Sequence, residues 1–437
     1  MNLKLSTHVH LFGVGGIGVS ALARAFSAEG KEVSGQDTDT SPIIDALKAE
    51  GISVSIGQSA ENIPKGTDLI IYSSALLERE PKFMKKLGEL NIPMLSYAEA
   101  LGLFSEEKYT IAVAGTHGKT TTTAMVSEIL MDGKLKPTVI VGSLLKRTHS
   151  NFVSGKGEYF VVEADDYRRQ FLTLAPKVLV ITNIGLDHLD YYHDVRDIQS
   201  AFRALAAKVP ASGYVITNLG NELVRPALSD TRAKIIDYRQ FMQKNIALPF
   251  PGAHNQENAA AALAVSHVLG IAESKALKSL SKFSGAWRRF DLLGKTRAGA
   301  FVYDDYAHNP DKVKAAIAGF REAHPERRLT VVFQPHLYSR TKTLLKEFSE
   351  SFDGADEVFV VPIFAAREKP SSPISSQILV SRIAAHLTKG KKKTKVSFAA
   401  DLKRLEAHLV KTLGDGDVVV TMGAGDIYKL GLDLVKV

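Results

Sequence analysis

The chain of 437 residues contains no cysteine. This absence excludes disulfides, thiolate nucleophiles and cysteine-ligated metal centres, so any chemistry must use other side chains. Long apolar runs are absent as well, since none approaches the roughly 18 residues that a membrane-spanning helix needs. The first residues lead directly into a strand-like run without the pattern of a cleavable signal. We therefore expect a cytoplasmic protein with no membrane partner.

Positively charged residues only slightly outnumber negatively charged ones. The 55 Lys and Arg outnumber the 47 Asp and Glu, which gives a net charge of +8. An excess this small suits anionic substrates but does not indicate a nucleic-acid partner. The 45% hydrophobic and 23% charged residues are those of a globular protein, and the length suggests roughly two to four domains.

What is present is an alternation of strand-like apolar runs and helix-like segments along the chain. This alternation is typical of βαβ units and predicts an α/β fold with parallel sheets. Composition and motifs divide the chain into three blocks, which we expect to be three domains: residues 1–105, 106–285 and 286–437.

The stretch VAGTHGKTTTTAMV lies in the second block, between a buried strand and a helix with one apolar face. Gly115 and Gly118 would let the backbone approach a phosphate at the helix N-terminus, where free N–H groups and the helix dipole favour anions. Lys119 would neutralise terminal phosphates, and Thr120 would ligate a magnesium ion. The usual phosphate loop has a glycine where this chain has Val113, so a tight turn with a surface lysine is the alternative.

A second glycine-rich loop opens the first block, in HVHLFGVGGIGVSALARAF. Gly13, Gly15 and Gly18 fit the dinucleotide-binding fingerprint between a strand and a helix. The next strand, EVSGQD, ends at Asp37, close to the separation at which an acidic residue meets a ribose hydroxyl. Taken alone, this loop favours a Rossmann oxidoreductase, although it implies a diphosphate more firmly than a nicotinamide.

Two further strand-like runs of the second block end in groups suited to a metal. Glu163 follows one run, and Asn183, Asp187 and His188 follow the other. Carboxylates at the carboxyl ends of parallel strands, beside a phosphate loop, are where magnesium on a nucleoside triphosphate would lie. The alternative is that the two acidic residues cap turns and that His188 packs locally.

Nucleotide-binding groups are also expected near the boundary of the second and third blocks. Asn255 and Asn258 precede an alanine-rich helix, and their amides suit an adenine edge, although asparagine is also an ordinary helix cap. Arg288 and Arg289 lie at a compositional seam, where an arginine could reach the γ-phosphate when domains close. An exposed basic turn is the alternative.

Seven motifs taken together resemble one family. They are GVGGIGVSALA, AGTHGKTTTTA, TNIGLDHLDYY, GAHNQENAAAA, RRFD, DDYAHNP and FQPHLYSRT, in the order and approximate spacing of the Mur ligases. In detail the chain is most similar to the members that add L-alanine, the first residue of the peptidoglycan stem peptide, to UDP-N-acetylmuramate. The resemblance extends from about residue 8 to the C-terminus, and in this family the shortened phosphate loop is the form used for ATP.

The resemblance implies an N-terminal Rossmann-like domain for the UDP sugar, a central P-loop ATPase-type domain with a parallel sheet, and a C-terminal Rossmann-like domain for the amino acid. It implies that the lactyl carboxylate attacks the γ-phosphate of ATP, and that the amine of L-alanine then attacks the acyl phosphate. The implied cofactors are ATP and Mg2+, as two ions for which Mn2+ can substitute. The implied partners are UDP-N-acetylmuramate and L-alanine, bound by a monomer or weak homodimer. The first glycine loop would hold the UDP diphosphate, without redox chemistry.

The resemblance also assigns roles to individual residues. It implies catalytic roles for Lys119, His188 and Arg289, and metal ligation by Thr120, Glu163 and His188. The implied ATP-binding residues are Gly115, Thr116, His117, Gly118, Lys119, Thr120, Thr121, Asn255, Asn258, Arg289 and Asp305. The implied UDP-sugar-binding residues are Gly13, Gly15, Gly16, Ile17, Gly18, Asp37, Ser73, Ser74, His117 and Asn183. The residues that would face the amino acid are Tyr306, His308 and Arg340.

Two departures from the family pattern limit this transfer. The stretch EADDYRRQF differs from the commoner EADESD pattern, so no family role passes to Asp165 and Asp166. Leu337 stands where many relatives have arginine. The alanine carboxylate would then have one guanidinium partner fewer, unless Leu337 is simply packed and a neighbour already fills the role.

Three other functions are weighed against this one. A recycling ligase that attaches a whole murein peptide to the same sugar nucleotide shares the fold and the ATP chemistry, but usually lacks the FQPHxYxRT motif. An NAD-dependent oxidoreductase would explain the first glycine loop but not the second. A nucleotide-regulated binding protein would not explain why metal and nucleotide groups occur together.

Overall fold

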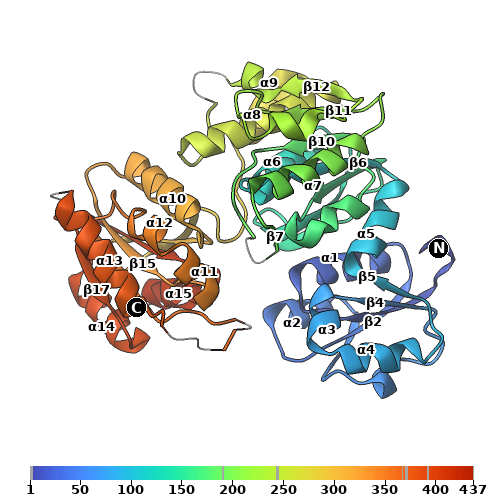
Figure 1. The fold of residues 1–437 in the computed structure, drawn as a ribbon, viewed down its shortest axis with the longest axis horizontal. Coiled ribbons are helices and arrows are strands. Elements are labelled where there is room, and N and C mark those ends of the chain that lie inside the picture. Colours follow the sequence, from blue (N-terminus) through green and yellow to red (C-terminus); the bar gives the residue numbers. More distant parts are fainter. Residues whose placement is uncertain are drawn as a thin grey trace. The chain divides into compact units, whose positions relative to one another are not determined.

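The computed structural model describes residues 3–188, 191–242, 246–366, 368–369, 373–390 and 393–436. Contacts divide the chain into two compact units: residues 1–247 with 257–284, and residues 248–256 with 285–437. In the described part of the chain the first unit contains two sheets and the second unit contains one (Figure 1). Among the described helices, none combines the length and the apolar character that a membrane span requires.

The first sheet is parallel throughout and has the strand order β3-β2-β1-β4-β5, which is that of the first five strands of the six-stranded Rossmann fold. In the central strand, Leu11 packs with the residues of one core cluster and Phe12 with those of another, because successive side chains point to opposite faces. The strands are β1 (His8–Phe12), β2 (Glu32–Asp37), β3 (Ser53–Ile56), β4 (Leu69–Tyr72) and β5 (Met94–Ser96). The helices are α1 (Ile17–Ala28), α2 (Pro42–Ala49), α3 (Ser74–Arg79), α4 (Pro81–Gly88) and α5 (Tyr97–Glu106).

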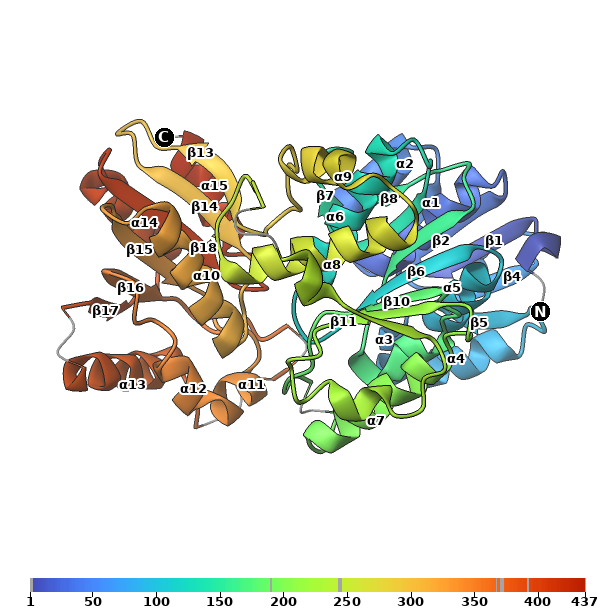
Figure 2. The same cartoon turned by 90° about the horizontal axis from the view of Figure 1, so that it is seen from above.

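The second sheet has the order β12-β11-β10-β6-β9-β7-β8, with only β8 antiparallel to its neighbour in the described pairings. Its central strands consist mainly of buried apolar residues, as expected for a sheet covered on both faces. The strands are β6 (Tyr109–Ala114), β7 (Thr138–Leu145), β8 (Ser150–Val153), β9 (Tyr159–Glu163), β10 (Val178–Ile181), β11 (Tyr214–Thr217) and β12 (Lys234–Asp237). The helical segments are α6 (Lys119–Asp132), η3 (Tyr167–Thr173), α7 (Val195–Ala207), α8 (Ala253–Val268) and α9 (Glu273–Leu280). Figure 2 shows α7 along one side of β10 and β11.

The two sheets of the first unit share one hydrophobic core. Phe104 of α5 packs edge-on against Phe26 of α1 and Phe160 of β9, with ring centroids 6.5 and 5.0 Å apart. A buried polar contact lies beside it, where Arg24 of α1 donates a hydrogen bond to Asn151 of β8 (2.6 Å). The helix that follows the first glycine loop is thus held against the second sheet.

The sheet of the second unit has the order β13-β14-β18-β15-β16-β17, in which β13 alone among the described strands pairs antiparallel. Its strands are β13 (Asp291–Lys295), β14 (Phe301–Asp305), β15 (Arg328–Phe333), β16 (Glu357–Val360), β17 (Lys395–Phe398) and β18 (Asp417–Met422). Its helices are α10 (Pro310–Ala323), α11 (Tyr338–Thr343), α12 (Leu345–Ser349), α13 (Ser376–Lys389), α14 (Leu402–Thr412) and α15 (Tyr428–Lys436). The predicted α/β fold with parallel sheets is confirmed.

Candidate functional site

The loop between β6 and α6 requires glycine at two positions. Gly115 has φ 135° and Gly118 has φ 83°, a region that side chains disfavour. A Cβ atom on Gly115 would lie 2.0 Å from Thr182 Oγ1, and one on Gly118 would lie 2.3 Å from Asn258 Oδ1. The backbone therefore turns tightly into the helix N-terminus, as the sequence predicts.

Asn183, just after β10, fixes this loop. Its side-chain oxygen accepts a hydrogen bond from the His117 N–H (2.9 Å), and its amide donates to the His117 carbonyl (3.1 Å). The Thr116 N–H donates to the Asn183 carbonyl (3.0 Å). Both polar atoms of the Asn183 side chain thus contact the loop, while its predicted contact with the sugar nucleotide stays a prediction.

Lys119, the first residue of α6, turns back over the loop. Its Nζ donates to the Gly115 carbonyl (2.6 Å) and to Asp166 Oδ1 (2.7 Å). Burial lowers the pKa of Lys119, but the charge of Asp166 and the hydrogen bond to it act against burial, and the net result is a raised pKa. A positive charge is therefore held beside the loop at the N-terminus of α6.

Thr120 and Glu163 form an oxygen-rich pair at the same end of the sheet. The Thr120 hydroxyl donates to Glu163 Oε1 (2.8 Å), and the Gly142 N–H donates to Glu163 Oε2 (2.7 Å). The two predicted metal ligands thus lie in direct contact, although 43 residues separate them in the chain. A hydroxyl and a carboxylate are the kind of donors that Mg2+ prefers.

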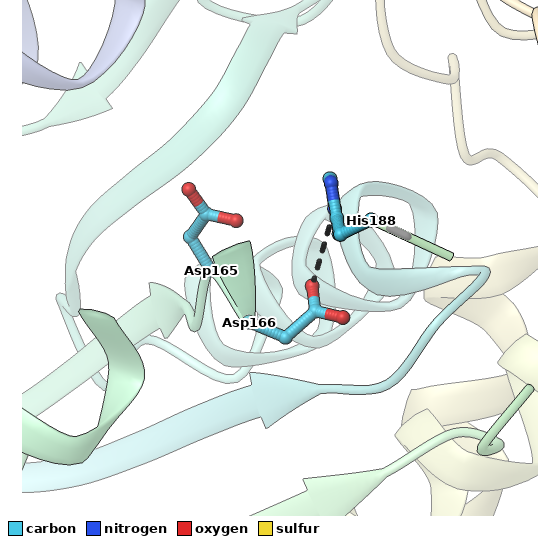
Figure 3. A group of neighbouring side chains, drawn as sticks. All are labelled: Asp165, Asp166 and His188. Atoms are coloured by element: carbon cyan, nitrogen blue, oxygen red, sulfur yellow. Dashed lines mark ion pairs between the residues drawn. The ribbon is translucent and has the colours of Figure 1, made fainter. Parts of the chain in front are cut away.

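The third predicted metal ligand, His188, lies in a separate group. Each of Asp165, Asp166 and His188 offers a ligand atom within 4.8 Å of the others (Figure 3). His188 Nε2 lies 4.0 Å from Asp166 Oδ1. Since Asp166 is buried and also binds Lys119, this group adjoins the phosphate loop.

The residues that follow these carboxylates adopt an unusual backbone. Arg168 and Arg169 have φ 54° and 58°, a strained conformation for residues other than glycine. Arg169 Nη2 binds Asp197 Oδ1 of α7 at 2.5 Å, and Arg168 forms an ion pair with Glu78 of α3. Contacts from both sides hold the segment in place.

The first glycine loop, between β1 and α1, is held by Asp37 and leaves little room for side chains. Asp37 Oδ2 accepts a hydrogen bond from the Gly15 N–H (2.7 Å), so this predicted ribose ligand also supports the loop. A Cβ atom on Gly13, where φ is 75°, would lie 2.7 Å from Ser73 Oγ. A Cβ atom on Gly18 would lie 2.7 Å from the Tyr97 ring.

In the second unit, the paired arginines differ in environment. The buried Arg288 donates to Asp304 (2.7 Å) and to the carbonyls of Gly423 (2.6 Å) and Gly425 (2.8 Å). Burial raises the pKa of Asp304 to about 6, against the lowering effect of Arg288. Arg289 is partly exposed, with its guanidinium 5.0 Å from the Tyr306 ring centroid. Arg288 therefore has a structural role, and Arg289 is the arginine that a ligand can reach.

The three residues predicted to face the amino acid are connected through His336. The ring centroids of Tyr306 and His308 lie 5.1 Å apart, and those of His308 and His336 lie 6.0 Å apart. Arg340 Nη1 lies 3.3 Å from His336 Nδ1. Leu337 is 7% exposed and has φ 69°, so it is packed.

The remaining residues predicted to bind the nucleotide form hydrogen bonds within the protein. Asp305 accepts hydrogen bonds from the N–H groups of Phe290 (2.8 Å) and Ala307 (2.9 Å). Asn258 Oδ1 accepts from the Thr122 hydroxyl (3.1 Å) and borders the phosphate loop. The Asn255 amide donates to the Pro251 carbonyl within the second unit (2.6 Å).

Comparison with known proteins gives matches along nearly the whole chain. Residues 8–109 match "Mur ligase family, catalytic domain", residues 113–242 match "Mur ligase middle domain", and residues 288–425 match "Mur ligase, glutamate ligase domain". The UDP-N-acetylmuramate–L-alanine ligase of Agathobacter rectalis is 38% identical over 98% of this chain and 98% of that protein. This chain belongs to the Mur ligase family. A second such ligase, from Clostridium kluyveri, is 36% identical over 97% of this Mur ligase and 96% of its own length.

Solved structures agree with the Mur ligase assignment. The UDP-N-acetylmuramate-alanine ligase of Thermotoga maritima matches with a TM-score of 0.80 and 27% identity, over 98% of both chains. The murein peptide ligase of Psychrobacter arcticus matches with a TM-score of 0.70 over 98% of both chains, but at 21% identity this shows the fold alone.

Several residues that contact the predicted site residues were not themselves predicted from the sequence. Asp165 and Asp166 were set aside because their motif departs from the family pattern, yet they join His188. His336 lies inside the quoted FQPHLYSRT motif, so its presence there was a usable signal. The ion pair of Arg168 with Glu78 had no signal, because it depends on the packing of two sheets.

Proposed function

We propose that this chain is an ATP-dependent ligase that joins L-alanine to the lactyl carboxylate of UDP-N-acetylmuramate in peptidoglycan precursor synthesis. The relatives that match almost its whole length are named for this activity. The observation that carries the proposal is the group at the start of α6, where Lys119 contacts Asp166 at 2.7 Å beside the phosphate loop.

The first step brings two anions together. A lactyl carboxylate oxygen attacks the γ-phosphorus of ATP, the bond to the β-phosphate oxygen breaks, and an acyl phosphate and ADP result. The loop N–H groups and the charged Lys119 would offset the negative charge that spreads over the transferring group. Because Lys119 is already oriented by Gly115 and Asp166, little reorganisation is needed.

The donors present suit magnesium, and we assign them to two ions. Thr120 and Glu163 would hold one ion, and His188 with Asp165 and Asp166 would hold the second. Hard oxygen donors predominate in both sets, as Mg2+ requires, and Mn2+ would also suit the imidazole. When bound, the ions would neutralise phosphate and carboxylate charge.

In the second step the amine of L-alanine attacks the acyl phosphate carbon, and the tetrahedral intermediate loses phosphate to leave the amide. Arg340 is the guanidinium we assign to the alanine carboxylate, with Tyr306 and His308 beside it. Arg340→Ala should then raise the KM for L-alanine far more than the KM for ATP. We assign Arg289, Asp305, Asn255 and Asn258 to the nucleotide.

The wider assignments follow from the same activity. We propose residues 1–105 as the UDP-sugar domain, 106–285 as the ATP domain and 286–437 as the amino-acid domain. We also propose a cytoplasmic location, and a monomer or weak homodimer as the assembly.

Phosphate release tests the proposed function. The purified protein is given UDP-N-acetylmuramate, ATP and Mg2+, with L-alanine, L-serine, glycine or murein tripeptide in separate reactions. The proposal expects the fastest release with L-alanine. Faster release with the tripeptide would favour the recycling ligase, and micromolar NAD binding without sugar-nucleotide binding would favour an oxidoreductase.

A further inference from the structure

Tyr97 occupies a position between the two halves of the first unit. It is the first residue of α5, whose N-terminus is capped by Ser96 and Glu99. A Cβ atom on Gly18 would lie 2.7 Å from Tyr97 Cζ and 2.8 Å from its hydroxyl oxygen. The absence of a side chain at Gly18 therefore makes room for the phenol on the first turn of α1.

The middle of α5 adjoins the end of η3, the segment that follows Asp165 and Asp166. A Cβ atom on Gly102 would lie 2.6 Å from the carbonyl of Thr173, so α5 and η3 pack with almost no gap. Helix α5 thus lies between the glycine loop at the start of α1 and the segment that follows Asp165 and Asp166.

The hydroxyl of Tyr97 lacks the kind of partner that similar phenols have. Tyr192 donates to the Asp166 carbonyl (2.5 Å), Tyr238 donates to the Thr182 carbonyl (2.8 Å), and the Tyr303 hydroxyl lies 3.0 Å from His324 Nε2. In the described part of the chain, no residue forms a hydrogen bond with the half-buried Tyr97 hydroxyl. Because the Tyr97 side chain is only half-buried, its hydroxyl can be reached by a ligand bound at the first turn of α1.

The protonation state of Tyr97 suits a donor. Burial raises the pKa of this phenol, and the negative charges of Asp165 and Glu163 raise it further. The phenol therefore keeps its proton throughout the working pH range and can donate to an anion.

We propose that the Tyr97 hydroxyl donates a hydrogen bond to a phosphate oxygen of the diphosphate held at the Gly13–Gly18 loop. The identity of the ligand rests on the proposed function, since the loop is assigned to UDP-N-acetylmuramate. Tyr97 is then a binding residue whose effect falls on the sugar nucleotide and not on ATP.

Tyr97→Phe tests this contact because it removes one oxygen and leaves the packing on Gly18 unchanged. Calorimetry without ATP should show the Kd for UDP-N-acetylmuramate rising about tenfold, the usual size for a hydrogen bond to a charged group. The Kd for UDP should rise by a similar factor. The melting temperature and the KM for ATP should not change, because the hydroxyl has no protein partner to lose.

Tyr303→Phe is the matched control, since it removes a hydroxyl that does have a partner. It should lower the melting temperature and leave sugar-nucleotide binding unchanged. Equal affinity of the wild type and Tyr97→Phe for UDP-N-acetylmuramate would overturn the inference. A loss confined to UDP-N-acetylmuramate, with UDP unaffected, would overturn the diphosphate assignment. No sugar-nucleotide binding by the wild type would instead overturn the proposed function.

Discussion

Two glycine-rich loops in the first unit, residues 13–18 and 115–118, each join a parallel strand to the N-terminus of a helix. The first loop has one glycine with positive φ, Gly13, and the second has two, Gly115 and Gly118. Both loops leave backbone N–H groups at a helix end, where an anion is favoured. Their backbones alone would suggest the same function.

The side chains around the loops differ. In the described structure, neutral Ser73 and Tyr97 crowd the glycines of the first loop, and Asp37 is hydrogen-bonded to its backbone. The second loop carries Lys119 in contact with Asp166, while Glu163 binds Thr120. A helix N-terminus is sufficient to bind phosphate, whereas phosphoryl transfer also needs charged groups that act on the transition state.

Lys119→Ala is expected to have the largest effect. If Lys119 has the proposed role, this change removes a charge-assisted contact to the transferring phosphoryl group and should cost at least about 3 kcal/mol of transition-state stabilisation, or more than about 100-fold in kcat. UDP-N-acetylmuramate binding at the first loop should be unaffected. Phosphate release and calorimetry measure the two effects, with circular dichroism to confirm folding. Near-normal turnover would show that Lys119 is not needed for phosphoryl transfer, and the proposed functional difference between the two loops would be wrong.

Gly115→Ala and Gly16→Ala compare the backbones of the loops. Gly115 has φ 135° and only 2.0 Å between a new Cβ and Thr182 Oγ1, so alanine there combines strain with overpacking. We expect a loss of about 3 kcal/mol in the free energy of unfolding. Gly16 has φ −69°, and its nearest neighbour would be 3.2 Å from a Cβ, so alanine should cost less than about 1 kcal/mol. Urea unfolding of both variants gives the values, and equal losses would contradict the comparison.

Asp37→Ala tests whether the first loop acts in binding only. The variant leaves the N–H groups of Gly15 (2.7 Å) and Thr38 (2.8 Å) without their carboxylate acceptor. The binding free energy of UDP-N-acetylmuramate should weaken by about 1 kcal/mol, which raises its KM about fivefold and leaves kcat unchanged. Asp37→Asn, which keeps an acceptor oxygen, should restore most of the affinity. A fall in kcat with an unchanged KM would show that this loop takes part in the chemistry.

His10 should make the first sheet sensitive to acid, with the smallest effect of the four. Burial lowers its pKa from 6.5 to about 4, so the folded protein holds a neutral imidazole, bound to Ser34 and Gln36. The unfolded chain binds the proton first, and stability therefore falls as the pH drops from about 6.5 towards 4. Between pH 7 and 5.5 the loss should be about 1 kcal/mol. Urea unfolding at both pH values should show that the free energy of unfolding drops less in His10→Gln than in the wild type. An equal drop in both proteins would show that His10 is not the cause of the acid sensitivity.

Much of the site could be predicted from single stretches of sequence. The strand and helix around each glycine loop form where the apolar pattern indicates, and Glu163 contacts Thr120 as two ligands of one ion would. The roles of Arg288 and Arg289 could not be separated in this way, because both side chains are alike and only burial against Asp304 distinguishes them. The grouping of Asp165 and Asp166 with His188 was not predicted, because a motif comparison weighs residue identity, whereas this grouping depends on the positions of the side chains in space.

The sequence by itself determined the fold class, the two glycine loops and the order of the motifs, because glycine conformations and the apolar periodicity of strands are local properties. Tertiary structure alone decided which distant groups meet. Asp166 reaches Lys119 across 47 residues, and Tyr97 covers Gly18, because strand order and helix packing set those distances. The energy of such contacts arises only after the sheets are assembled, so no single stretch of sequence contains it.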